Sequence, residues 1–202
     1  MDPHRGPDNE AALWSAWHDA AAGSAVDEAL RGLYAELDAA VAARGPTCWV
    51  SGKCCKFDDY GHRLYVTGLE VAWFLRQLEG GAGWEGEAPA EQTSSLGRAA
   101  RREPRPPDPN GDFVFRLPQF AEHPGACPYQ IDGRCSTHAV RPLGCRVFFC
   151  QRGTEDWQQD LYEDFLRRLS GLHERHGIEY RYLDWIDGLN RAEAATAQPA
   201  GR

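Results

Sequence analysis

Residues 48–55 read CWVSGKCC, and residues 127–150 read CPYQIDGRCSTHAVRPLGCRVFFC. Together these two stretches hold all seven cysteines of the 202-residue chain. The short spacing within each stretch lets neighbouring side chains converge with little loss of loop-closure entropy. An odd number of cysteines excludes complete intramolecular disulfide pairing. The cysteines are therefore metal ligands, redox groups or small buried hydrophobic residues.

Charge and composition limit the class of protein. The net charge of −8 argues against a broad surface for nucleic acid. The polar start, MDPHRGPDNE, has no apolar signal-peptide core, and no stretch approaches the roughly 18 apolar residues of a membrane span. We therefore expect a cytoplasmic protein with an unknown protein or small-molecule partner, and neither nucleic acid nor membrane. Thiols stay reduced in that compartment, which favours metal binding.

Hydrophobic periodicity predicts five helices, over residues 11–20, 24–44, 67–79, 154–176 and 185–192. We expect capping boxes at Ser24–Asp27 and Thr67–Glu70, and a side-chain cap from Thr154. Strand candidates cover 64–66 and 113–117, residues 180–183 are extended, and Asp132-Gly133 is typical of a hairpin turn. The helices before Cys48 and after Cys150 should pack together and hold the two cysteine groups opposite each other.

The length indicates one domain, over residues 11–193. Residues 1–10 and 194–202 are expected to be disordered. Residues 80–112 are rich in Gly, Pro, Glu and Arg, and we interpret them as a flexible insertion. The predicted fold class is α+β, mostly helical, with short strands or hairpins around a cysteine metal site.

Thiolates are soft ligands that favour zinc or an iron–sulfur cluster over magnesium or calcium. The spacing lacks the two C-x2-C knuckles of a zinc ribbon. Adjacent Cys54 and Cys55 would point to opposite faces of an extended strand, so the backbone must turn there or the centre must be large. Gly52 suits such a turn. A polynuclear cluster is slightly favoured, with a redox-active vicinal disulfide as the weaker alternative.

The pattern resembles the YkgJ family of cysteine-cluster proteins, also called the CxxCxxCC or zinc- or iron-chelating domain family. Residues 48–55 match its first motif except at Ser51, where the family has its second cysteine. Downstream, the family motif is matched by Cys127-Pro128, Asp132-Gly133, Cys135 and Arg141-Pro142-x-x-Cys145. The resemblance covers about residues 45–79 and 120–152, and implies metal binding without a known reaction for most members.

Six cysteines are the candidate ligands and still outnumber the four thiolates that zinc or a cluster needs: Cys48, Cys54, Cys55, Cys127, Cys135 and Cys145. Whether Cys150 ligates or is a buried hydrophobic residue stays open. Arg141 and Arg146 flank Cys145, where they could offset the charge of a thiolate cluster. The alternative for both arginines is a surface ion pair. Tyr129 could shield the centre from water or simply pack.

The first functional hypothesis is an iron–sulfur protein with a structural, redox or sensing role. The second is a structural zinc protein, in which the metal supplies folding energy. The third is an enzyme that uses the centre, for example one like the protein-lysine methylases that carry a related cysteine cluster. Common linear enzyme motifs are absent. An enzyme should show a pocket with convergent polar groups beside the metal, whereas a structural zinc site should be closed.

Overall fold

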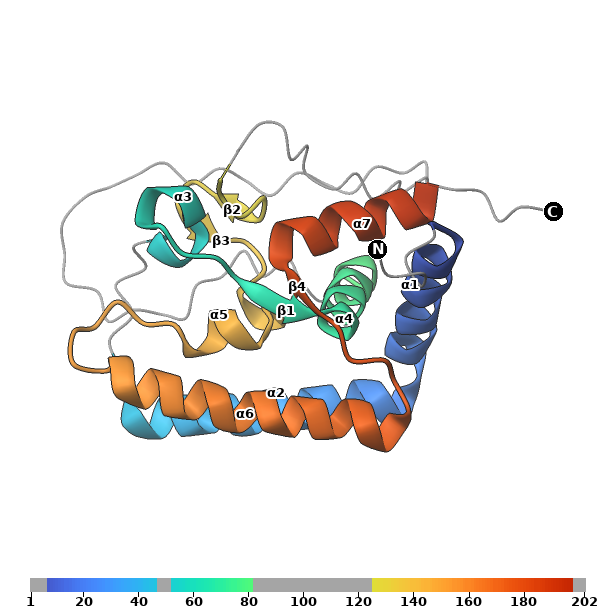
Figure 1. Ribbon diagram of the computed structural model, residues 1–202. Helices are drawn as coiled ribbons and strands as arrows, with labels where there is room; N and C mark the ends of the chain where they lie inside the picture. Colours follow the sequence, from blue (N-terminus) through green and yellow to red (C-terminus); the bar gives the residue numbers. More distant parts are fainter. Residues whose placement is uncertain (1–6, 47–51, 82–124, 198–202) are drawn as a thin grey trace, which may run out of the picture.

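Two long helices run side by side along one edge of the protein in the computed structural model (Figure 1). Helix α2 spans Ser24–Arg44 and helix α6 spans Glu155–His176. The structure describes residues 7–46, 52–81 and 125–197. The pairing confirms that the helix preceding the first cysteine stretch packs against the helix following the second.

Three more helices complete the helical part: α1 (Pro7–Ala22), α4 (Gly68–Glu79) and α7 (Trp185–Ala197). Proline suits the first turn of a helix, where its missing N–H has no intrahelical partner, and α1 begins at Pro7. Glu10 of α1 pairs with Arg191 of α7 at 2.5 Å. The helices therefore extend into both stretches, 1–10 and 194–202, that were expected to be disordered.

Short elements complete the fold, and among them α5 (Leu143–Val147) packs against α6 and α2. Strand β1 (Tyr65–Thr67) pairs antiparallel with β4 (Tyr182–Asp184), and β2 (Gln130–Ile131) pairs with β3 (Arg134–Cys135). The predicted hairpin turn is confirmed, with φ of 51° at Asp132 and 77° at Gly133. The other short elements are η1 (Lys53–Cys55), α3 (Phe57–Tyr60) and η3 (His138–Val140). The protein is thus mostly helical α+β, as predicted.

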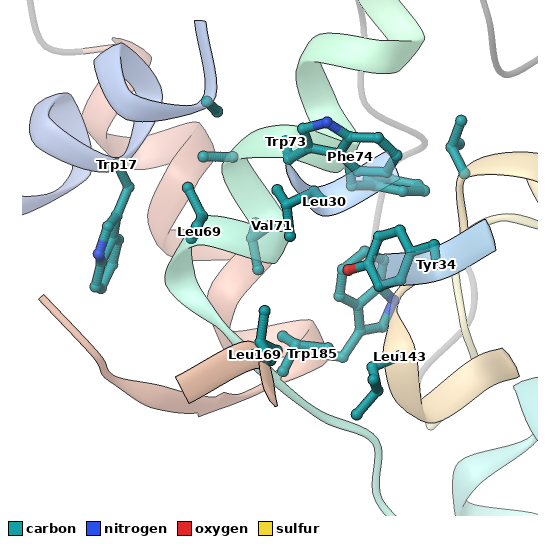
Figure 2. Packing of buried hydrophobic residues seen from close by; sticks show 14 of the residues in the cluster. Trp17, Leu30, Tyr34, Leu69, Val71, Trp73, Phe74, Leu143, Leu169 and Trp185 are labelled. Carbon is teal, nitrogen blue, oxygen red and sulfur yellow. The ribbon is translucent and has the colours of Figure 1, made fainter. Parts of the chain in front are cut away.

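The hydrophobic core joins α1, α2, α4, α6 and α7 (Figure 2). Its largest fully buried side chains include Trp17, Phe74 and Trp185, and the rings of Phe74 and Trp185 meet edge to face at 4.9 Å. Each such side chain contributes roughly 1.5–3 kcal/mol on burial. The helix α4 begins with Gly68 because a β-carbon there would lie 2.3 Å from the Trp17 ring.

The predicted caps have mixed outcomes. Thr67 and Glu70 form a complete capping box at the start of α4, as expected. The expected box at Ser24–Asp27 is wrong, because Gly23 is the N-cap and makes no side-chain cap. Thr154 is at the N-cap position of α6 but does not cap it. Its hydroxyl instead donates to the Gln151 carbonyl and accepts from Gln158, each at 2.6 Å.

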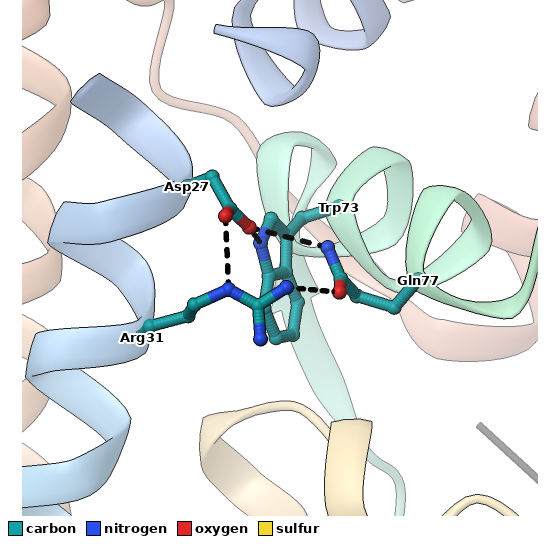
Figure 3. A network of polar contacts seen from close by, with 4 residues as sticks. All are labelled: Asp27, Arg31, Trp73 and Gln77. Atoms are coloured by element: carbon teal, nitrogen blue, oxygen red, sulfur yellow. Dashed lines mark hydrogen bonds and ion pairs between the residues drawn. The ribbon is translucent and has the colours of Figure 1, made fainter. Parts of the chain in front are cut away.

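Asp27 has a different role, joining α2 to α4 (Figure 3). It accepts hydrogen bonds from Arg31 at 2.9 Å, from the Trp73 indole at 2.8 Å and from Gln77 at 3.2 Å. Arg31 also donates to Gln77 at 2.5 Å. Burial acts to raise the pKa of Asp27, but the hydrogen bonds and the Arg31 charge outweigh it and hold that pKa below 3.8.

Several predictions lie outside the described residues. They include Cys48, Ser51, the strand candidate at 113–117 and nearly all of the insertion predicted at 80–112. Among the described helices, none combines the length and the apolar character that crossing a bilayer requires.

Candidate metal centre

The backbone turns sharply at the first cysteine pair. Gly52 has φ of 67°, which favours glycine, and the one-turn helix η1 follows directly. The turn brings the sulfurs of Cys54 and Cys55 to 3.9 Å from each other, on the same side of the chain. The edge between two sulfurs of a tetrahedral zinc site is about 3.8 Å when each bond is about 2.3 Å. The expected turn is therefore confirmed, and both cysteines are free thiols in this structure.

Backbone hydrogen bonds join the two cysteine segments. The amide of Cys127 donates to the Cys55 carbonyl at 2.7 Å, and the amide of Asp58 donates to the Gly125 carbonyl at 2.9 Å. The Gln130 side chain donates to the Gly52 carbonyl at 2.8 Å. A β-carbon on Gly52 would lie 2.4 Å from the Gly133 carbonyl oxygen. Close approach of the two segments thus depends on a glycine at position 52.

The Cys55 thiol is coupled electrostatically to other cysteine side chains. It shares hydrogen bonds with three other thiols, which raise its pKa, namely those of Cys127, Cys135 and Cys54. The same bonds lower the pKa of Cys54 to about 7 and of Cys135 to about 6, and also lower that of Cys127. The pKa values of thiols in the two segments therefore depend on one another.

Cys145, on α5, completes a set of five interacting thiols. Burial raises its pKa, and so do the charges of Cys127, Cys135 and Cys54. In the part of the chain that the structure describes, no group of three or more His, Cys, Asp or Glu side chains is arranged to hold a metal as it stands. Hydrogen-bonded thiols and metal-bound thiolates differ in geometry, because ligation removes the shared protons and turns the sulfurs toward one point.

Two buried donors without a partner lie near the thiols in the chain. The Tyr129 hydroxyl and the Arg141 Nε are buried and make no hydrogen bond among the described residues. Charge at Cys127 raises the pKa of Tyr129, after burial, and the Trp185 indole lowers the pKa of Cys127. An orphaned buried donor is costly, so these groups fit an anionic acceptor, such as a thiolate-bound metal group.

The two arginines flanking Cys145 differ. The Arg141 charge lowers the pKa of Cys54, Cys135 and Cys145, so its guanidinium acts on the thiols. Arg146 is buried and pairs with Asp38 of α2 at 2.6 Å. Its other bonds go to the carbonyls of Arg141 and Ala139, both at 2.8 Å. Arg146 therefore makes the ion pair weighed as its alternative, though a buried one, and holds the loop that carries Arg141.

Glu70 positions α5, a role that the sequence did not reveal. This carboxylate is 2% exposed, and besides capping α4 it accepts from the Tyr34 hydroxyl at 3.0 Å and the Leu143 amide at 2.9 Å. Burial raises the pKa of Glu70, although the hydrogen bonds oppose the shift. One residue thus joins α2, α4 and the helix that carries Cys145. The Thr-x-x-Glu motif signals only the cap.

Comparison of the chain with protein-family models, with curated proteins and with solved structures finds no match. The resemblance to the YkgJ family stays a prediction carried by its motifs. Of the six candidate ligands, five interact with one another as described, and Cys48 lies outside the described residues. Cys150 is half-buried after α5.

Proposed function

We propose that this protein binds an iron–sulfur cluster through thiolates drawn from Cys54, Cys55, Cys127, Cys135 and Cys145, with a structural, redox or sensing role. The observation that carries the proposal is the direct connection of the two cysteine segments, in which the Cys127 amide donates to the Cys55 carbonyl at 2.7 Å. Thiolates crowd negative charge, and a bound cation removes their mutual repulsion. A cluster supplies one-electron transfer and cross-links the segments that ligate it.

One feature favours a cluster over zinc. The buried donors of Tyr129 and Arg141 suit the inorganic sulfides of a cluster, which accept hydrogen bonds that tune its potential. The motif resemblance is compatible with either metal.

The second candidate is a structural zinc protein. It is favoured by the 3.9 Å between the Cys54 and Cys55 sulfurs, which is close to the edge of a zinc–thiolate tetrahedron. In that case the metal would supply folding energy only, on the order of 10 kcal/mol apparent.

Metal and acid-labile sulfide analysis of protein purified without oxygen tests the proposal, together with the visible spectrum. We expect iron and sulfide in similar amounts and a brown chromophore. Colourless protein with about one zinc per chain would replace the first candidate with the second. Protein that contains neither metal, even after reconstitution with iron and sulfide or with zinc, would contradict both.

A further inference from the structure

A cavity of about 610 Å³ lies beside the thiols and is partly open to solvent. It is bounded by α5, by the first turns of α6 and by the β1–β4 pair, and Cys54 and Cys145 contribute to its wall. Ligand sites in proteins span about 300–1,000 Å³. The thiol site therefore borders a cavity large enough for a small molecule, unlike a closed structural zinc site.

Aromatic rings dominate the wall. Six of the lining residues carry rings: His62, Tyr65, Phe148, Phe149, Tyr162 and Tyr182. Among the described residues, six large hydrophobic side chains are exposed, and three of these line this one cavity, with Tyr65 at 45%, Phe148 at 40% and Tyr182 at 39%. Apolar surface concentrated in this way usually marks a binding site.

The rings are held in place before any ligand binds. His62 stacks on Phe148, with 5.5 Å between centroids and 13° between planes, and His62 Nε2 lies 3.3 Å from the Cys54 carbonyl. Tyr65 and Tyr182 stack at 5.6 Å and 19° across the β1–β4 pair. The two near-parallel pairs hold four rings of the wall in fixed orientations.

The wall behind the rings is also fixed. Gln158 of α6 accepts from the Phe149 amide at 2.9 Å and donates to the Phe149 carbonyl at 3.1 Å. A preformed wall loses less conformational entropy when it binds a rigid ligand than a mobile wall would lose.

The cavity does not favour one sign of ligand charge. It is lined by one guanidinium, Arg63, and one carboxylate, Glu155. Arg63 faces Asp184 at 3.5 Å, and Asp184 also accepts from the Ile186 amide at 3.0 Å. Because Arg63 already faces Asp184, it offers little to a ligand anion. Stacking is therefore the main attraction that the wall offers, and edge-to-face or offset ring contacts are worth roughly 0.5–1.5 kcal/mol each.

We propose that this cavity binds a planar, uncharged aromatic molecule, with one edge of the ligand toward Cys54 and Cys145. The inference depends on the proposed function only for the metal beside the ligand, because the stacking surfaces belong to the protein. Its consequence is that a small aromatic molecule reaches the metal centre directly.

Calorimetric titration of the metal-loaded protein with 2-naphthol tests the proposal, with decahydro-2-naphthol as the saturated, non-planar control. We expect 2-naphthol to bind at least about tenfold more tightly than the control, since only the planar compound stacks. Phe148→Ala and Tyr182→Ala should each weaken 2-naphthol binding by roughly fivefold. Tyr180→Ala, which removes another exposed ring outside the cavity, should leave it unchanged.

Equal binding of the two compounds, or equal weakening by all three variants, overturns the proposal. Metal content is measured on the same samples. Metal present without selective naphthol binding contradicts the cavity proposal alone. Selective binding by protein that holds no metal contradicts the proposed function alone.

Discussion

The helical core and the thiol lobe, residues 52–60 and 125–147, are stabilised in different ways. The core has helices of 12 to 22 residues that bury large aromatic and leucine side chains. The described elements of the lobe have between two and five residues, such as β2 and α5. Elements so short bury less apolar surface than the long helices, although Phe57, Tyr129 and Leu143 of the lobe are buried in the same core. We infer that the lobe depends in addition on cross-links, namely hydrogen bonds between its segments and, as proposed, a metal.

The largest expected effect follows from removing thiols. Cys55→Ser and Cys127→Ser should each abolish metal binding, at a cost on the order of 10 kcal/mol of apparent metal-linked stability. The matched control is Cys150→Ser, the same substitution at a half-buried cysteine that is not among the five proposed ligands. Metal content by elemental analysis is the readout. Full metal content in both variants would show that the lobe does not use these thiols.

The next effect concerns the connection between lobe and core. Glu70→Ala leaves the Leu143 amide and the Tyr34 hydroxyl buried without an acceptor, so we expect a loss of about 3–5 kcal/mol in the free energy of unfolding. Glu79→Ala, on an exposed position of the same helix, should change stability by less than about 0.5 kcal/mol. Denaturant unfolding measures the free energy of unfolding of both variants. Similar losses of stability would contradict the role of Glu70 in connecting the lobe to the core.

A smaller effect tests the contact inside the lobe. Gly52→Ala combines a left-handed backbone with overlap against the Gly133 carbonyl, and should cost about 2–4 kcal/mol and reduce metal affinity. Gly133→Ala has the same backbone strain but no atom within 4 Å of the new carbon, so we expect about 1–2 kcal/mol. Competition with a chelator compares the two affinities, and equal affinities would contradict the contact.

The smallest effect belongs to the core alone. Asp27→Ala should cost about 1–2 kcal/mol at pH 7 and leave metal binding unchanged. Because the pKa of Asp27 is lowered by folding, its contribution is present above the unfolded pKa and is lost as pH falls through the folded one. The difference from wild type should therefore shrink below about pH 4. Asp19→Ala, at an exposed position, is the control, and a difference independent of pH would contradict this explanation.

Local sequence signals predicted the parts of the fold that depend on local physics. Periodicity predicted the helices, Asp132-Gly133 predicted the hairpin, and Thr67 with Glu70 predicted a capping box. Asp27 and Thr154 do not have their expected capping roles, because their side chains accept hydrogen bonds from other residues. Asp27 accepts from Trp73 of α4, and Thr154 accepts from Gln158, one turn further along α6. The contacts of Arg146 with Asp38 and of Glu70 with Leu143 join residues far apart in the chain, so no local pattern could signal them.

The interaction between the two cysteine groups could be expected from their composition, and the turn at Gly52 from the adjacency of Cys54 and Cys55. The hydrogen-bond donors near the thiols could not be predicted from the sequence. Tyr129 was weighed as a shield, but Trp185 looked like an ordinary start of a helix, and only the fold brings its indole near Cys127.

Hydrogen–deuterium exchange of the metal-loaded and metal-stripped protein, read by mass spectrometry, tests the central claim most directly. If a metal cross-links the lobe, stripping it should remove protection in residues 52–60 and 125–147 while α2, α4 and α6 keep theirs. Unchanged protection in the lobe, or equal loss of protection throughout the chain, would contradict the account.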